Sequence, residues 1–370
     1  MRKARAKQQR SAARAATGVE SSPAGGPSPP PREIFRATGR PYSWPQVLAG
    51  AYFRGDAAIL HAEVADAIAA MSYAEEEGFA VPEDCGAPAG EAFRLEHNLI
   101  TGEEMERWLD HCGIELDQFD AYFASRALAT RFAAQLAEIR RDYAPAAAAV
   151  VDTMWTATIL SGSLDAFTLP LVRRVAARAD ANATADASAV ALTLHEGEPR
   201  VPETLCTPGL LEELAVLEAL SAIAEDHVAS AEHCAAELRE RAYQLARIVV
   251  AEAVFASLDL ANEAYQGVVA DGLAFDEVAR RAGVELAERT FFADEAPEGA
   301  MPLLSALPGR VLEPEAGECG YLVRGLRRRI EPDLSDPDVA ARVRERLLVA
   351  HFDALVGHYV TWSFDPWTVP

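Results

Sequence analysis

The run IVVAEAVF, residues 248–255, constrains the fold of this chain most, because it interrupts a pattern that is otherwise helical. It is short and rich in β-branched residues, and so it predicts a strand. Two helical segments follow at 258–272 and 275–283, then a helical turn at 300–307, and then strands at 311–314 and 320–328 that residues 315–319 connect. This order of elements predicts a small α+β domain over residues 247–333.

The residues that precede this domain predict helices. Apolar residues recur three and four positions apart, as at Val64, Ile68 and Met71, which indicates one buried helix face. Thr101 and Glu104 form a capping box, which marks a helix start. We therefore predict a mainly α chain with a helical domain over 41–178, a linker over 179–207, connecting helices over 208–246, and a C-terminal helix and tail over 334–370.

Aromatic residues line two neighbouring helices of the helical domain, with Trp108 on the first and Phe119 and Phe123 on the second. Such a stripe indicates either core packing or an apolar groove that binds a helical or extended peptide. The aromatic C-terminus SFDPWTVP likewise predicts either a docking peptide or a segment packed over the core.

The N-terminus differs from the rest of the chain in charge. Six cations and no acid precede Glu20, whereas the whole chain has a formal net charge of −23. The Gly/Pro-rich residues that follow cannot build a core, so we predict a tail over residues 1–40, either solvated or docked on an acidic partner. The acidic body disfavours nucleic acid and anionic lipid as partners, and no apolar run is long enough to span a membrane.

The five cysteines are dispersed and show no metal-binding spacing, which favours free thiols and a cytoplasmic location. His227 and Cys234 are seven residues apart and could share a helix face, but no further metal ligands accompany them. No glycine-rich phosphate-binding motif is present. We expect neither a metal nor a cofactor.

The α+β domain resembles the parvulin family of peptidyl-prolyl isomerases. FDEVARRAG resembles the helix before the active-site loop of that family, LPGRVLEP its turn into the closing hairpin, and GYLVRGLRRR its last strand. The helices around Trp108 are similar to the chaperone domain that precedes the parvulin domain in SurA/PpiC-like proteins. The resemblance implies a helical, chaperone-like N-terminal domain followed by a parvulin-like domain.

The residues that carry isomerase activity in this family are absent from the motifs. Alignment puts Ile248 at the position of the histidine on the first strand, and Tyr321 at that on the last strand. Because an X–Pro amide must twist through a barrier of about 18–20 kcal/mol, catalysis needs polar groups that stabilise the twisted form. We predict weak or absent isomerase activity. If the domain is active, Tyr321 and either Asp294 or Glu295 would replace the usual network.

Three functions remain open from the sequence. The first is a polypeptide-binding protein, either a chaperone or a factor for the maturation of a precursor peptide. Its predicted contact residues are apolar or aromatic: Trp108, Phe119, Phe123, Phe291, Phe292, Met301 and Tyr321. The second is a divergent isomerase, and the third is a non-catalytic scaffold that binds a peptide-modifying enzyme.

Overall fold

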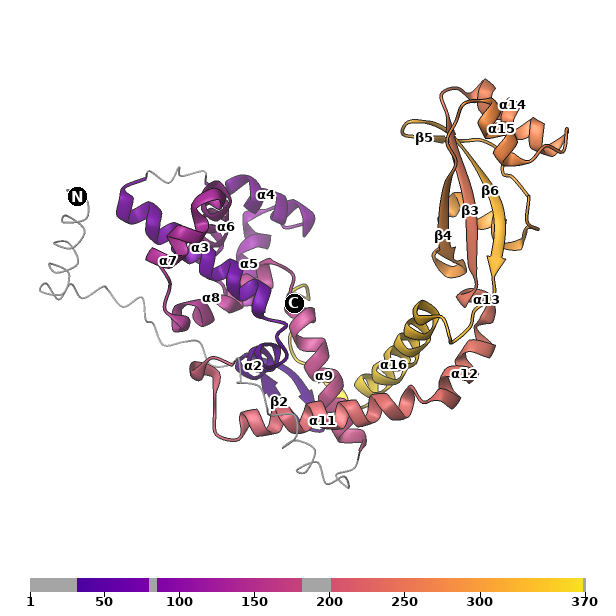
Figure 1. Ribbon diagram of the computed structural model, residues 1–370. Coiled ribbons are helices and arrows are strands. Elements are labelled where there is room, and N and C mark those ends of the chain that lie inside the picture. The colour runs from indigo at the N-terminus through magenta and orange to yellow at the C-terminus, as the bar shows by residue number, and fades with distance from the viewer. Residues whose placement is uncertain (1–31, 80–84, 182–200, 369–370) are drawn as a thin grey trace, which may run out of the picture. The chain divides into compact units, whose positions relative to one another are not determined.

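The computed structural model describes residues 32–79, 85–181 and 201–368, which form two compact units. The first unit contains residues up to 219 together with 356–370, and the second contains residues 220–355. The boundaries lie within two helices, α11 (Leu210–Val228) and α16 (Pro337–Tyr359) (Figure 1). A mainly α chain with a small α+β domain, as predicted, is confirmed.

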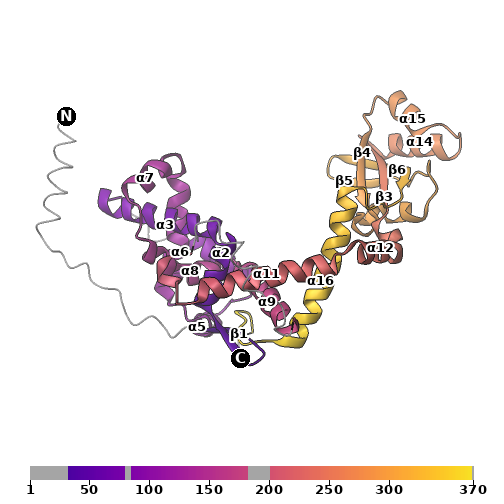
Figure 2. The ribbon, with the colours of Figure 1, turned by 60° about the horizontal axis from the view of Figure 1, so that its bottom comes forward.

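The first unit is a set of helices beside a small sheet. Its helices before the undescribed residues 182–200 are α2 (Trp44–Arg54), α3 (Ala58–Glu77), α4 (Ala87–Glu96), α5 (Gly102–Cys112), α6 (Leu116–Arg131), η1 (Ala133–Gln135), α7 (Leu136–Asp142), α8 (Ala147–Leu160) and α9 (Leu164–Asp180). The 3₁₀ turn η2 (Glu203–Leu205) and the start of α11 follow. α3, α6 and α8 pack against one another (Figure 2).

Local sequence signals account for several of these helix ends. The Glu104 amide donates to the Thr101 hydroxyl at 3.2 Å, and the Thr101 amide donates to the Glu104 carboxylate at 2.7 Å, so the predicted capping box forms. Gly113 has a φ of 63° and ends α5 in the left-handed conformation that favours glycine.

The sheet of the first unit joins the two ends of the described chain. β1 (Glu33–Ala37) lies between β2 (Arg40–Ser43) and β7 (Val360–Trp362), and Phe35 faces Tyr42 on one side and Trp362 on the other. The predicted tail over 1–40 is therefore wrong for residues 33–40, because β1 pairs both with the adjacent β2 and with the distant β7. The rest of that tail, and most of the predicted linker, lie outside the described residues.

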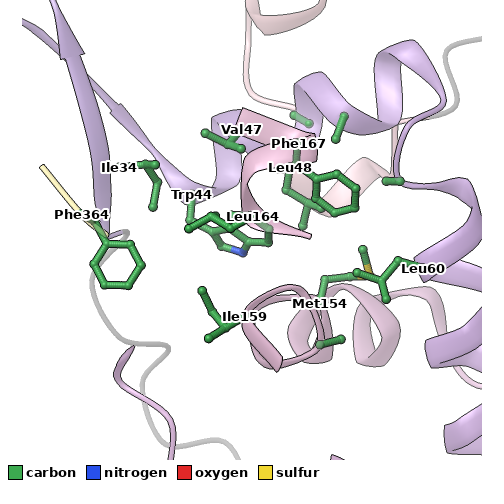
Figure 3. Close-up of a cluster of buried hydrophobic side chains, with 14 of the residues drawn as sticks. Ile34, Trp44, Val47, Leu48, Leu60, Met154, Ile159, Leu164, Phe167 and Phe364 are labelled. Atoms are coloured by element: carbon green, nitrogen blue, oxygen red, sulfur yellow. The ribbon is translucent and has the colours of Figure 1, made fainter. Parts of the chain in front are cut away.

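The main core of the first unit lies between this sheet and the helices. Side chains from α2, α3, α8 and α9 converge with Ile34 of β1 and with Phe364, which follows β7 (Figure 3). The predicted C-terminal segment 334–370 is thus divided: its last residues complete the core of the first unit. None of the described helices has both the length and the apolar character that crossing a lipid bilayer requires.

The second unit is built on a four-stranded antiparallel sheet of order β4-β3-β6-β5. The strands are β3 (Arg247–Phe255), β4 (Ala287–Phe292), β5 (Glu315–Gly317) and β6 (Gly320–Ile330). Its helices are α12 (Ala231–Glu240), α13 (Ala242–Leu245), α14 (Leu258–Val269) and α15 (Phe275–Arg281), with the 3₁₀ segments η3 (Ala293–Glu295) and η4 (Glu298–Ser305).

Two elements of this sheet differ from the sequence-based prediction. β4 forms in a segment whose mixed polar and apolar residues predicted no strand, because it is an edge strand with mostly exposed side chains. β5 occupies residues that were predicted to connect two strands, whereas the predicted strand 311–314 makes only one bridge, between Val311 and Gly325.

The two faces of the sheet carry separate clusters. α14 and α15 cover one face, where Ala251, Ala253 and Phe255 pack with Val323. η3 and η4 cover part of the other face, where Ile248 and Val250 pack with Leu303 and Leu326. α16 packs at the end of the sheet: Val339 and Val343 bury Leu245, and Arg342 pairs with Asp294 at 2.9 Å and with Glu295 at 2.5 Å.

Candidate functional site

A groove of about 380 Å³ lies in the first unit between α3, α6 and α8. Val64, Ile68 and Met71 of α3 line it from one side, because a spacing of three and four residues places them on one helix face. Ala121 and Tyr122 of α6 line it from another side. The groove thus offers apolar surface on the outside of the unit.

The rim of this groove is polar and mostly acidic. Glu63, Glu75 and Asp152 contribute carboxylates, and Arg126 contributes a guanidinium group. Arg126 donates to Glu63 at 2.8 Å and lies 5.5 Å from the centre of the Tyr122 ring. No ion pair of Glu75 or Asp152 is found among the described residues, so both charges face solvent without a cation.

Burial affects the one titratable side chain on the floor of the groove. It raises the pKa of the Tyr122 phenol, and the nearby Arg126 charge opposes this rise only in part. Tyr122 therefore stays neutral at ordinary pH, and at 9% exposed its ring belongs mainly to the core beside the groove.

The predicted aromatic contacts of the helical domain lie in the core and not in this groove. Trp108 is 1% exposed and Phe119 is 4% exposed, and both rings contact Phe93. Phe123 is half-buried against the same core, with its ring 4.9 Å from that of Phe119. The core-packing interpretation of the stripe holds for Trp108 and Phe119, and neither side chain is accessible to a bound chain.

The aromatic C-terminus packs on its own unit and forms a C-terminal strap, which we define as residues 360–368. Phe364 is buried in the core, the Trp367 ring stacks on His97 with 3.9 Å between centroids, and His111 Nε2 lies 2.8 Å from the Asp365 carbonyl oxygen. A second cavity of about 670 Å³ lies between this strap and the α8–α9 corner.

In the second unit, the strand register separates the residues of the predicted active network. Tyr321 pairs with Phe255 at one end of β3, whereas Ile248 pairs with Arg329 near the other end. Seven residues of strand at about 3.3 Å each place Ile248 and Tyr321 roughly 23 Å apart. Asp294 and Glu295 follow β4 at the Ile248 end and pair with Arg342. The alternative network of Tyr321 with Asp294 or Glu295 is therefore wrong.

The register identifies a different polar cluster on the sheet face that η4 partly covers. Glu252 pairs with Arg324 on β6 at 3.0 Å and with Arg289 on β4 at 2.9 Å. Arg324 also pairs with Glu315 of β5, and the Glu252 and Arg324 side chains are largely buried. Glu252, and not Ile248, is thus the β3 residue across from the GYLVR segment.

The remaining predicted contact residues of this unit lie in different places. Phe291 packs beside Ile248, whereas Phe292 lies on the other face with the Arg342 guanidinium 4.5 Å from its ring centre. Tyr321 packs at the margin of the cluster under α14 and α15, and Met301 is 50% exposed on η4. The structure does not bring these four side chains into one groove.

Sequence reasoning missed the residues that do line a groove. Val64, Ile68 and Met71 were recognised as one helix face, but their period is the same for a core face and for a groove face. Ala121 and Tyr122 gave no signal beyond helical packing. No group of three or more His, Cys, Asp or Glu residues that could hold a metal ion is found within residues 32–79, 85–181 and 201–368.

Comparisons with known proteins give three distant structural similarities. No family model and no curated protein matches the chain. A peptidylprolyl isomerase, PrsA from Bacillus cereus, is 12% identical with a TM-score of 0.30, over 58% of this chain and 87% of that one. PrsA from Bacillus subtilis is 15% identical with a TM-score of 0.20, over 56% and 86%.

The third similarity is to a structure described with PEB4 and Cj1289, two SurA-like chaperones of Campylobacter jejuni. It is 11% identical with a TM-score of 0.20, over 47% of this chain and 89% of that one. Two of these structures are therefore described in the terms that the sequence motifs suggest, one as a peptidylprolyl isomerase and one with SurA-like chaperones.

Proposed function

We propose that this chain is a cytoplasmic, chaperone-like protein that binds an unfolded or precursor polypeptide in the groove between α3, α6 and α8. The groove itself is the observation that carries this proposal: an apolar floor with an acidic rim on the outside of a folded unit. All five cysteines are free, which fits a reducing compartment.

The composition of the groove favours a chain with apolar and basic side chains. Apolar side chains gain about 25 cal/mol for each Å² that they remove from water, and the half-buried Ile68 and Met71 on the groove floor provide such surface. The unpaired carboxylates of Glu75 and Asp152 would meet the cations of the bound chain. This is the helix-in-groove mode of peptide recognition.

The second unit supports binding without isomerisation. Its sheet carries Glu252 between two arginines, where both oxygens already accept from guanidinium groups. The sequence contains no histidine between His233 and His351, so the sheet and the helices that cover it, residues 247–333, offer no imidazole to a twisted amide. The outer edge of β4 is exposed and could take an extended segment of the same polypeptide by strand addition.

Filling the groove tests the proposal. Ala121 is exposed on the groove wall, so Ala121→Trp fills the groove without removing a buried side chain. The matched control is Ala92→Trp on α4, an exposed alanine that does not line the groove. Binding of a short fluorescein-labelled peptide of leucine, alanine and arginine is measured by anisotropy at low salt.

We expect Ala121→Trp to weaken binding at least about tenfold, which corresponds to about 1.4 kcal/mol, while Ala92→Trp binds as the wild type does. Equal binding by all three proteins would refute the groove as the site. Binding of small apolar compounds but of no peptide would show that the groove serves a small ligand.

A second experiment tests the absence of catalysis. We expect the full chain to leave the cis/trans exchange rate of a short X–Pro peptide unchanged in NMR exchange spectra, and Tyr321→Phe to have no effect on peptide binding. Enzyme-like acceleration, lost in Tyr321→Phe or in Glu252→Gln, would show instead that the sheet face is an isomerase site.

A further inference from the structure

The basic N-terminal segment, residues 2–14, is attached to the unit that contains the acidic groove. The described chain begins at Arg32, whose backbone oxygen accepts from the Trp44 amide. The Arg32 guanidinium lies 4.5 Å from the Phe364 ring centre and 5.5 Å from that of Trp155 on α8. α8 also supplies Asp152, Thr153 and Thr156 to the groove, so the anchor point and the groove share a helix.

The connecting residues are long enough to span the distance. Arg14 and Arg32 are eighteen positions apart. At about 3.3 Å each these positions reach roughly 60 Å when extended. The longest helix of the groove, α3, has 20 residues and is about 30 Å long at 1.5 Å per residue. Because the segment and the groove belong to one chain, their contact is intramolecular, which raises the effective concentration of the segment at the groove.

The segment matches the groove in charge and in side-chain size. It contributes the cations Arg2, Lys3, Arg5, Lys7, Arg10 and Arg14, with no acid before Glu20. The residues between these cations are mostly alanine, whose small side chains suit a groove of about 380 Å³. The groove offers the complement, an apolar floor with the unpaired carboxylates of Glu75 and Asp152 on its rim.

We infer that residues 2–14 dock in the groove between α3, α6 and α8 of their own chain and compete there with any other basic polypeptide. Docking would keep the apolar floor covered while no polypeptide is bound. Docking of residues 2–14 in the groove does not depend on the proposed function. Their competition with another polypeptide does rest on it, because it requires that the groove bind such a polypeptide.

Photocrosslinking within the full-length chain tests this contact. A benzoylphenylalanine at Gln9 lies between the cations of the segment, and its crosslinks are mapped by mass spectrometry on the monomeric fraction. We expect crosslinks to groove residues of α3, α6 and α8. They should decrease strongly in 1 M salt, where the Debye length is only about 3 Å.

Charge reversal on the rim provides the matched comparison. Glu75→Lys with Asp152→Lys should lower the crosslink yield about tenfold, whereas Glu77→Lys, an exposed acid of α3 that does not line the groove, should not. Unchanged urea unfolding of the variants confirms that they fold.

Three results would each overturn the inference. They are crosslinks to the C-terminal strap, crosslinks only between molecules, and a crosslink yield that is the same with and without the two rim carboxylates. None of these readouts requires a bound peptide. A failure here would therefore leave the proposed function standing, and a failure of the peptide-binding assay would not affect this result.

Discussion

Replacing Phe364 by alanine tests whether the C-terminus is an integral part of the first unit. Phe364 is 8% exposed and lies more than 300 residues from the β1 strand beside which it packs, since its amide donates to the Ile34 carbonyl oxygen at 3.2 Å. Its ring contacts the His111 ring at 5.2 Å and the Trp155 ring at 5.5 Å.

The expected loss follows from these contacts. Truncating a buried phenylalanine to alanine costs about 3–5 kcal/mol. The guanidinium of Arg32, 4.5 Å from the ring centre, contributes a cation–π term of about 0.5–1 kcal/mol, which is lost as well. Some relaxation of a segment near the chain end reduces the total, so we expect about 3–4 kcal/mol.

Tryptophan fluorescence isolates this effect, because all five tryptophans, Trp44, Trp108, Trp155, Trp362 and Trp367, belong to the first unit. With a urea m-value of about 3 kcal/mol/M, the unfolding midpoint should fall by about 1 M. The control is Leu307→Ala in the second unit, where the side chain is 81% exposed and the midpoint should not move. If Phe364→Ala unfolds at the midpoint of Leu307→Ala, the C-terminal strap does not stabilise the unit and this reasoning fails.

Two further predictions concern titratable groups. Burial lowers the pKa of His61, whose Nδ1 lies 2.6 Å from the Tyr52 hydroxyl oxygen. The unfolded chain then takes up the proton first, so stability is complete above a pH of about 6.5 and decreases as the pH falls through that value. His61→Gln should flatten this dependence in urea midpoints measured between pH values of about 5 and 8, and an unchanged slope would contradict it. Burial also raises the pKa of the Cys112 thiol to about 12, so iodoacetamide should label the exposed Cys319 in the native protein and Cys112 only after unfolding. Equal labelling rates for the two thiols, followed by mass spectrometry, would be inconsistent with the buried position of Cys112.

Helices and strands whose own residues mark their start, end or type were predictable from the sequence. α5 has its capping box at one end and Gly113 at the other, and the two helices α14 and α15 flank Gly272 as the pattern indicated. β3 was predicted because β-branched residues favour a strand wherever it is placed. Each of these signals lies within about a dozen residues of the element it specifies.

Contacts between distant residues were not predictable in the same way. β1 is ordered by β2 and by β7, and Phe35 meets Trp362 from the far end of the chain. The pairing of Glu252 with Arg324 was missed because a motif alignment does not specify strand register. The spacing of apolar residues along a helix is also the same whether the helix face packs in a core, as Trp108 does, or lines a groove, as Met71 does.

By itself the sequence determined the helical character of the chain, the position of the small α+β domain, the acidic body with its basic N-terminal segment, and the lack of histidines between residues 247 and 333. The tertiary structure decided which apolar faces are covered and which carboxylates lack a cation. The physical reason is that helix periods and caps arise from neighbouring residues. Burial, strand register and charge pairing depend instead on residues that only the folded chain brings together.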